Sequence, residues 1–321
     1  MENQAFGFAK KLRDTLYYRL PYPALKFAYN IGIRLLFGKQ YKAMVSYMET
    51  DGDMGKRQLL SDIKRSGKLQ AIYGKWTEDY DKLPNRILKD REGNLVAKHI
   101  CIDGISRLIY LPKEMGKAAA RVYYETLLLE QDEQSPHCYF TEELKKWLKQ
   151  TPGGTVLDLG AAEGLISLEC VENSDRVILF EGDEKWFMPL ETTFEPYRNK
   201  VNIVRKFVSD STDEEYISID DYFGDNIPED IKLIKIDIEG YEQRALDGMK
   251  KTIERNPDVL LLICAYHTQD AEKEIESIMG KMGFAGKSRE GYIFFWVDKN
   301  FSEPYARKGV VEYRGKNANQ N

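Results

Sequence analysis

Acidic and glycine residues in the middle of the chain have spacings that suit a bound charged molecule. Asp158 ends a short apolar run, Gly160 and Gly164 stand four residues apart, and a run with helical spacing follows. Glycine lets a backbone approach a ligand closely, and the first amides of a helix are unpaired donors at its positive end. The segment therefore predicts a strand, a turn and a helix that hold a phosphate or carboxylate. A sharp bend that binds nothing is the alternative.

A second set of ionisable residues lies in one short segment. It consists of Lys235, Asp237 and Glu239, which are separated by isoleucines. Alternate residues of a strand share a face, so we expect these three side chains to point the same way. A central parallel strand is normally apolar on both faces. The three charges either form a buried network that fixes strand order, or Asp237 and Glu239 reach the cleft beyond the carboxyl ends of the strands, where such sheets bind ligands.

Strands and helices alternate from residue 155 onward, which predicts a mostly parallel α/β sheet with helices on both faces. His267 follows the last buried run of this series and is either structural or catalytic. We expect a final helix at 271–282 and a C-terminal antiparallel hairpin. The expected strands are 155–159, 176–181, 201–205, 231–240 and 259–265, with a helix at 241–254 and hairpin strands at 284–287 and 292–297.

The turn differs from that of dinucleotide enzymes, which usually carry Gly-x-Gly-x-x-Gly. The missing third glycine favours S-adenosylmethionine, whose carboxylate is smaller than a pyrophosphate and whose sulfonium is attracted to acids. Glu181, at the end of the second strand, is predicted to bind the ribose hydroxyls. Asp210 is predicted to reach the adenine edge, with a solvated loop acid as the alternative. The predicted cofactor-binding residues are Asp158, Gly160, Ala161, Glu163, Gly164, Glu181 and Asp210.

Methyl transfer to an alcohol requires the hydroxyl in line with the sulfonium methyl. Its proton must be removed by a base or acidified by a metal. We predict that Asp237, Glu239 and His267 remove the proton or support its removal. Together with Asp270 they also offer the ligands that magnesium or manganese prefers, so a divalent metal is left open.

The chain resembles the FkbM-type family of S-adenosylmethionine-dependent methyltransferases over residues 105–297. The most specific match is Lys235-Ile236-Asp237-Ile238-Glu239-Gly240-Tyr241-Glu242. It is supported by 156–164, Leu179-Phe180-Glu181 and Leu246-x-Gly248. Family members often carry Glu-Pro where this chain has Glu181-Gly182. By its residues alone, the polar run from Glu130 to Tyr139 is either a functional loop or an ordinary loop that ends a helix. Residues 130–137 resemble a segment seen ahead of the cofactor domain in some members, which implies a cofactor or substrate lid.

The resemblance implies O-methylation of a hydroxyl on a sugar or a secondary metabolite. We expect the acceptor to be a sugar of a surface glycan or its precursor. Two alternatives stay open: a non-catalytic glycan- or membrane-binding protein on a methyltransferase-like fold, and a nicotinamide-dependent sugar oxidoreductase, which the missing glycine disfavours.

Composition narrows the class of protein. With 42% hydrophobic and 12% aromatic residues, 321 residues can bury a large core. The net charge of −5 argues against nucleic acid as the main partner. The four cysteines are widely spaced, and no signal-peptide pattern or membrane-spanning run is present, so we expect reduced thiols and a cytoplasmic location.

The N-terminal region differs in charge from the rest. Residues 1–45 hold eight Lys or Arg and two acids, interleaved with aromatic and aliphatic residues. This pattern predicts peripheral contact with an anionic membrane, or helices that cover the enzyme domain.

Three domain segments are expected from the whole sequence. They are a mainly helical N-terminal region with a small β-meander at 1–112, a methyltransferase domain at 113–297 and a polar tail at 298–321. Within the meander, strands 99–102 and 105–111 are expected to be joined by a two-residue Asp103-Gly104 turn.

Overall fold

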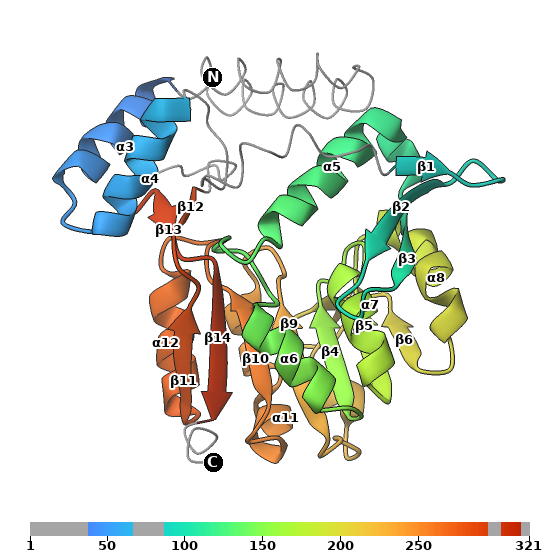
Figure 1. The fold of residues 1–321 in the computed structure, drawn as a ribbon. Coiled ribbons are helices and arrows are strands. Elements are labelled where there is room, and N and C mark those ends of the chain that lie inside the picture. The colour runs from blue at the N-terminus through green and yellow to red at the C-terminus, as the bar shows by residue number, and fades with distance from the viewer. Residues whose placement is uncertain (1–37, 67–86, 295–302, 316–321) are drawn as a thin grey trace.

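The computed structural model describes residues 38–66, 87–294 and 303–315. A seven-stranded sheet lies at its centre, in the order β11-β14-β10-β9-β4-β5-β6 (Figure 1). The strands are β4 Thr155–Leu159, β5 Arg176–Phe180, β6 Val201–Val204, β9 Ile231–Ile236, β10 Leu260–Cys264, β11 Phe284–Ser288 and β14 Val310–Gly315. All neighbouring pairs from β10 to β6 are parallel, and β14 is antiparallel to both β10 and β11. The predicted fold class is therefore confirmed.

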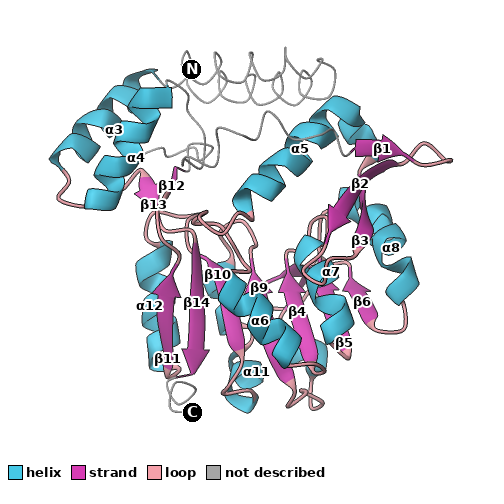
Figure 2. Ribbon diagram, in the orientation of Figure 1, coloured by secondary structure: helices cyan, strands magenta, loops and turns pink. Residues whose placement is uncertain are grey.

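The central strands are buried because helices cover both faces of the sheet (Figure 2). Alternation divides the strand residues between two apolar clusters, with Val156 and Leu233 in one and Leu157 and Ile234 in the other. The first cluster includes side chains of α5 Gly116–Glu130, α6 Glu142–Gln150, α7 Leu165–Cys170 and α8 Phe187–Phe194. The second includes side chains of α9 Ile219–Phe223, α10 Glu242–Asp247, α11 Lys250–Arg255 and α12 Ala271–Lys281.

Short elements complete the described chain. The 3-10 turns are Lys113–Met115, Val171–Asn173, Glu184–Trp186 and Glu195–Tyr197. Two small sheets pair β7 Phe207–Val208 with β8 Tyr216–Ile217, and β12 Ile293–Phe294 with β13 Ala306–Arg307.

A three-stranded meander precedes the central sheet, as the sequence predicts. It consists of β1 Ile87–Lys89, β2 Leu95–Ile100 and β3 Ser106–Leu111. The predicted two-residue turn is wrong, because the Cys101 amide donates to the Ile105 carbonyl at 3.0 Å and leaves three residues in the loop. Asp103 instead accepts the Ile105 amide at 2.9 Å and the guanidinium of Arg107 at 2.8 Å, which fixes the longer loop.

At the C-terminal end, the expected helix and first hairpin strand form as α12 and β11, but the predicted partner of that strand and the predicted tail are wrong. Residues 284–288 pair with β14, whereas Ile293 and Phe294 belong to a separate two-stranded sheet. The segment 298–321 is not a polar tail throughout, because β14 lies between β10 and β11. Glu312, a charged residue in this strand, is buried because its carboxylate is paired with Arg289 at 3.0 Å and Arg314 at 2.7 Å.

Two predicted boundaries in the centre of the chain also change. Strand β9 ends at Ile236, so Asp237 and Glu239 do not belong to it. The expected helix 241–254 is two helices, α10 and α11, separated at Gly248 and Met249. At Gly248 a Cβ would lie 2.2 Å from the carbonyl oxygen of Ser209, so the neighbouring loop packs against the break.

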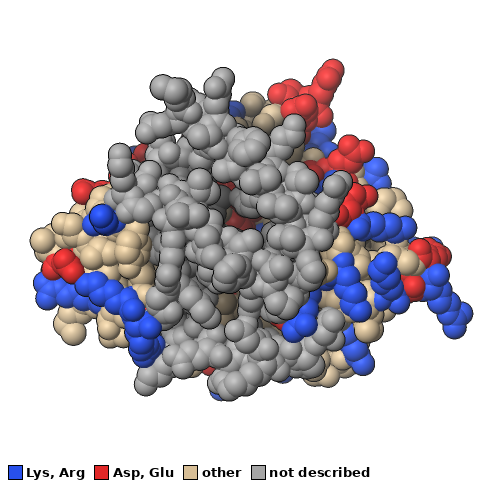
Figure 3. Space-filling model, turned by 90° about the horizontal axis from the view of Figure 1, so that it is seen from above, with Lys and Arg blue, Asp and Glu red and all other residues tan. Residues whose placement is uncertain are grey.

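Residues 38–66 form two helices, α3 Gly38–Thr50 and α4 Met54–Ser66. Their apolar side chains form a third cluster with Tyr305 and Ala306. Lys and Arg side chains of described residues gather on both flanks of the face in Figure 3. The predicted membrane contact of residues 1–45 falls mostly outside the described residues. Among those described, no helix combines the length and apolar character needed to cross a membrane.

A truncation tests whether β14 is part of the core. Val310, Val311 and Tyr313 are at most 3% exposed, so ending the chain at residue 309 uncovers both neighbouring strands. We expect loss of cooperative thermal unfolding, measured by circular dichroism. A chain ending at residue 315 is the control and should melt as the full chain does. Cooperative melting of the shorter chain near the control temperature would contradict this role.

Candidate active site

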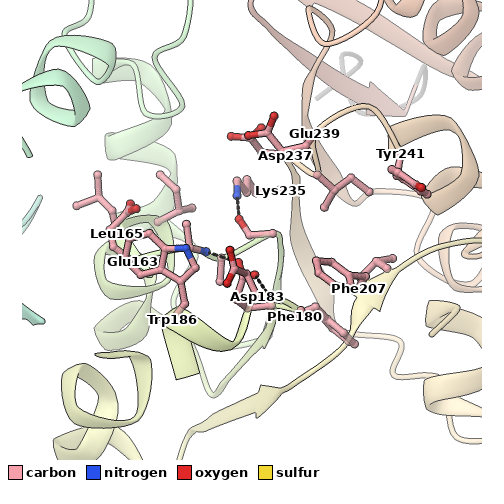
Figure 4. A pocket seen from close by; sticks show the side chains of 18 of the residues that line it. Glu163, Leu165, Phe180, Asp183, Trp186, Phe207, Lys235, Asp237, Glu239 and Tyr241 are labelled. Atoms are coloured by element: carbon pink, nitrogen blue, oxygen red, sulfur yellow. Dashed lines mark hydrogen bonds between the residues drawn. The ribbon is translucent and has the colours of Figure 1, made fainter. Parts of the chain in front are cut away.

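A cavity of about 490 Å³ lies beyond the carboxyl ends of β4, β5 and β9, which is large enough for a nucleotide-sized ligand. This is where open α/β sheets bind ligands. Figure 4 shows Asp237, Glu239 and Lys235 between Trp186 and Glu163 on one side and Phe207 and Tyr241 on the other.

The glycine turn forms one wall of the cavity through a close backbone contact. Gly160 has φ of +77°, and a Cβ there would lie 1.9 Å from the carbonyl oxygen of Asp237. The Gly160 and Ala161 amides both donate to the Phe180 carbonyl, at 2.9 and 3.1 Å. Gly164, with φ of +79°, precedes α7 and packs against Phe194. Only glycine fits both positions, as the sequence pattern indicates.

A buried ion pair supports the turn from below. Lys235 Nζ lies 3.1 Å from Asp158 Oδ1, and both side chains are at most 5% exposed. The ammonium also donates to the Gly160 carbonyl at 2.5 Å, and Ser167 Oγ donates to Asp158 at 2.7 Å. Burial lowers the pKa of Lys235, but the charges of Asp158 and Asp237 outweigh it and raise that pKa above its usual range. Asp158 thus holds the turn and does not line the cavity.

Glu181 lines the cavity at the end of β5. Its Oε2 accepts the Ala162 amide at 2.8 Å, and its Oε1 accepts the Asp183 amide at 2.7 Å. Each carboxylate oxygen has a second lone pair. The backbone therefore orients the carboxylate, which keeps acceptor capacity for two neighbouring hydroxyls.

Glu163 and the aromatic residues beside it form the opposite wall. Tyr123 of α5 donates a hydrogen bond to Glu163 Oε2, and its ring lies 5.6 Å from that of Trp186. Burial raises the pKa of Glu163 above its usual range. The hydrogen bond between Tyr123 and Glu163 therefore connects α5 to the glycine turn.

Asp237 is the centre of a group of polar side chains at the other end of the cavity. Tyr139 Oη donates to Asp237 Oδ2 at 2.6 Å, while His267 Nε2 and His137 Nε2 lie 3.4 and 3.9 Å from the carboxylate. Burial alone would raise the pKa of Asp237, but the charges of Lys235 and His267 hold it well below its usual range. Asp237 therefore stays ionised at neutral pH and is a weak base.

His267 lies behind Asp237 and is not among the cavity-lining residues. Its Nδ1 is 2.8 Å from Glu242 Oε1, and both side chains are 3% exposed. Burial lowers the pKa of His267, but the bond to Glu242 and the charges of Glu242, Asp237 and Glu239 raise it to about 9. The imidazole is thus a cation at neutral pH, which does not agree with its predicted role as a base.

Glu242 also shapes the turn after β9. It accepts the amides of Ile238 and Gly240 at 3.1 and 3.2 Å. Glu239, between them, has φ of +56°, and its side chain is 85% exposed. The expected alternation therefore fails at Glu239, which reaches the cavity rim from a left-handed turn and not from a strand.

The structure brings most of the predicted site residues together. Those that line the cavity are Gly160, Ala161, Glu163, Glu181, Asp237 and Glu239. Asp158, Gly164 and His267 support it from behind. Asp210 does not line it, because its carboxylate is paired with Arg244 at 2.7 Å on the exposed side of α10.

The segment from Glu130 to Tyr139 forms a wall of the cavity. The sequence alone did not decide whether this segment is an ordinary loop or a lid. Glu130, Gln131, His137 and Tyr139 line the cavity. Arg289 donates to the carbonyls of Cys138 and Tyr139 at 2.9 and 3.0 Å. The Val310 amide donates to the Pro136 carbonyl at 2.8 Å. These bonds fix the segment to the C-terminal strands, so it is a rigid wall in this structure.

Tyr266 is a further cavity residue that the sequence did not single out. Its hydroxyl lies 3.0 Å from His137 Nε2. Burial lowers the pKa of His137 to about 4, so this imidazole is neutral at neutral pH. An aromatic residue directly after strand β10 is a local signal for a cavity residue. Its partner His137, however, lies 129 positions away in the sequence.

Two groups of possible metal ligands share Asp237 in the part of the chain that the structure describes. One is His137, Asp237 and Cys264, the other is Asp237, Glu242 and His267, and Asp270 belongs to neither. In the second group Glu242 Oε1 and His267 Nδ1 already bind each other, and the same oxygen accepts two backbone amides. A cation at that oxygen would have to displace these bonds, so this group does not fit a resident magnesium or manganese. The first group includes a thiol, which is not a ligand that these metals prefer.

A family model for the methyltransferase FkbM domain matches residues 122–293, more than half of the chain. The chain belongs to the FkbM methyltransferase family. The matched region includes the glycine turn, Glu181, Asp237, Glu239 and His267. No curated protein gave a significant match.

Similar solved structures include the FkbM methyltransferase of Methylobacillus flagellatus. It is 17% identical, with a TM-score of 0.38, and the match covers 63% of this chain and 54% of that one. The magnesium protoporphyrin IX methyltransferase of Synechocystis, solved with bound S-adenosylmethionine, is 15% identical, with a TM-score of 0.37 and coverage of 62% and 83%. The chain thus spans about half the length of the FkbM methyltransferase that it matches.

Replacing Gly160 tests the close backbone contact. In Gly160→Ala, the Cβ would overlap the Asp237 carbonyl, so we expect unfolding free energy to fall by more than about 3 kcal/mol. Gly93→Ala is the matched control, because Gly93 has φ of +83°, close to that of Gly160, but no atom within 4 Å of the added Cβ. It should lose only about 1 to 2 kcal/mol. Equal losses in urea titrations would show that the contact is unimportant.

The charge on His267 predicts a pH-dependent stability. The folded-state pKa of about 9 lies above the ordinary value of 6.5, so this stabilisation is complete below pH 6.5 and is lost as pH rises through 9. The loss should be roughly 3 kcal/mol. Urea unfolding at pH 6.5 and 9.5 measures it, with His267→Gln as the reference that lacks this titration. Parallel curves for the two proteins would refute the assignment of charge.

Proposed function

We propose that the protein transfers the methyl group of S-adenosylmethionine to a hydroxyl of a sugar in a surface glycan or its precursor. The observation that carries the proposal is the cavity, where a tight glycine turn, an oriented Glu181 and an anionic Asp237 meet at the carboxyl edge of the sheet. Membership of the FkbM family supports the transfer of a methyl group.

The residues fit a sulfonium nucleotide by their chemistry. Glu181 is suited to accept hydrogen bonds from the two ribose hydroxyls, and the turn at Gly160 leaves room for the backbone to approach the ligand. When bound, S-adenosylmethionine supplies an electrophilic methyl group. Phe207 and Tyr241 are 44% and 39% exposed in the cavity wall, and exposed aromatic rings of this kind suit a flat base.

Asp237 contributes orientation and charge. Because Tyr139, Lys235 and His267 stabilise its anionic form, it remains an acceptor for a donor group in the cavity. Strong attraction between an anion and a sulfonium would stabilise the ground state more than the transition state, where the positive charge is disappearing. The two neighbouring cations reduce that attraction.

We also propose where the protein acts. Its activity is placed in the cytoplasm, at the membrane face where lipid-linked glycans are built. The positive charge of residues 1–45 supports contact with anionic lipid there. The mixed wall of the cavity, with polar Gln131 and His137 beside aromatic Trp186 and Tyr266, supports a hydroxyl-rich acceptor.

Calorimetry with S-adenosylmethionine tests the cofactor site. Glu181→Gln removes a charged acceptor, which is worth about 1.5 to 3 kcal/mol and predicts binding about 10- to 100-fold weaker. Glu184→Gln, an exposed acid outside the cavity, is the control and should bind normally. A wild-type chain without affinity for S-adenosylmethionine would exclude the enzyme and favour a binding protein.

Turnover is then measured with tritiated S-adenosylmethionine and a panel of nucleotide sugars and glycans. We expect label in at least one sugar, and the same rate after treatment with a chelator, because Glu242 and His267 are already bonded to each other. Loss of activity with the chelator and its return with magnesium would show that the protein needs a divalent metal.

A further inference from the structure

Helix α5 ends in the cavity with an acid that makes no hydrogen bond to the polar residues around Asp237. Glu130 is the last residue of this 15-residue helix and lines the cavity. The other cavity acids have partners: Tyr123 donates to Glu163, backbone amides to Glu181, and Tyr139 to Asp237. Across the part of the chain that the structure describes, no hydrogen bond or ion pair of the Glu130 carboxyl is found.

The surroundings of Glu130 make its proton affinity high. Asp237, Glu163 and Glu239 line the same cavity and repel negative charge on Glu130, and Tyr123 and Tyr266 are further ionisable groups in its wall. The C-terminus of α5 adds further negative potential. Burial first, and then the three acids, raise the pKa of Glu130 to about 8. A carboxyl group in this range is a far better base than an ordinary glutamate.

We propose that the Glu130 carboxylate is the base that takes the proton from the acceptor hydroxyl. This inference rests on the proposed methyl transfer. As the hydroxyl oxygen bonds to the methyl carbon, the carbon–sulfur electron pair stays on sulfur, which becomes a neutral thioether. The O–H bond breaks, its electrons remain on the ether oxygen, and the proton passes to Glu130.

The other candidates for this role are held in less suitable states. Asp237 is stabilised as an anion, and His267 is a cation bonded to Glu242. The Glu239 side chain is 85% exposed, so water competes for it. His137 faces Tyr266 through Nε2 and is the one neutral base that rivals Glu130. The described structure shows no hydrogen-bond partner for its other ring nitrogen, Nδ1, so the experiment must distinguish the two.

The test compares Glu130→Gln with three other variants of the full chain. The substrates are tritiated S-adenosylmethionine and whichever nucleotide sugar of the panel the wild type methylates. We expect Glu130→Gln to reduce kcat at least about 100-fold, with the Kd for S-adenosylmethionine within twofold of wild type. Glu130→Asp should recover part of the rate. Glu133→Gln, which changes an exposed acid outside the cavity, should keep it.

The pH profile gives an independent readout. At saturating S-adenosylmethionine, the wild-type rate should rise through one ionisation at or below pH 8, since a bound cation lowers the pKa of a nearby acid. Glu130→Gln should lose that ionisation and His137→Gln should keep it.

Three results would overturn the assignment. A Glu130→Gln variant with the wild-type rate would exclude Glu130 while leaving the methyltransferase intact. Loss of the ionisation only in His137→Gln would move the role to His137. A wild type that binds S-adenosylmethionine but methylates no hydroxyl compound would refute the proposed function and this step with it.

Discussion

The buried ion pair of Lys235 and Asp158 is the interaction on which the site depends. It joins the two central strands, β9 and β4, at 3.1 Å, and the same ammonium holds the carbonyl of Gly160. Its positive charge also keeps Asp237 anionic. Removing one partner would leave a buried charge without compensation, which costs about 3 to 5 kcal/mol. One lysine therefore links the two strands, holds the turn and favours the ionised form of the central acid.

A second constraint is the close approach of two chain reversals. Gly160 after β4 and the Asp237–Gly240 turn after β9 touch through their backbones, and each requires a left-handed residue. Glu242 stabilises the second turn by accepting two of its amides and by pairing with His267. The specific sequence string therefore encodes a shape as much as a set of reactive groups. Of its acids, Glu242 is structural and Asp237 faces the cavity.

The sequence predicts what local pattern controls. The mainly apolar runs at 155–159 and 231–236 become buried parallel strands, as their length and β-branched residues predict, and the glycines mark the turn. Contacts between residues that are far apart in the sequence could not be predicted. Lys235 and Asp158 are 77 positions apart, and no local signal links them. Strand β14 was missed because Glu312 reads as a surface residue until Arg289 is placed beside it. The wall at 130–139 was ambiguous because its anchors come from residues 289 and 310.

The dependence of that wall on the last strand has a consequence for synthesis in the cell. Ribosomes deliver the glycine turn, Glu181 and Asp237 well before Arg289 and Val310, which seat the Pro136 to Tyr139 backbone. Domains fold as units, and contacts between distant segments form late. A growing chain can thus assemble the first strands of the sheet before the cavity has the bonds that hold its Pro136 to Tyr139 wall. The cavity is therefore complete only after residue 310 has been made, even though most of its other walls come from earlier residues.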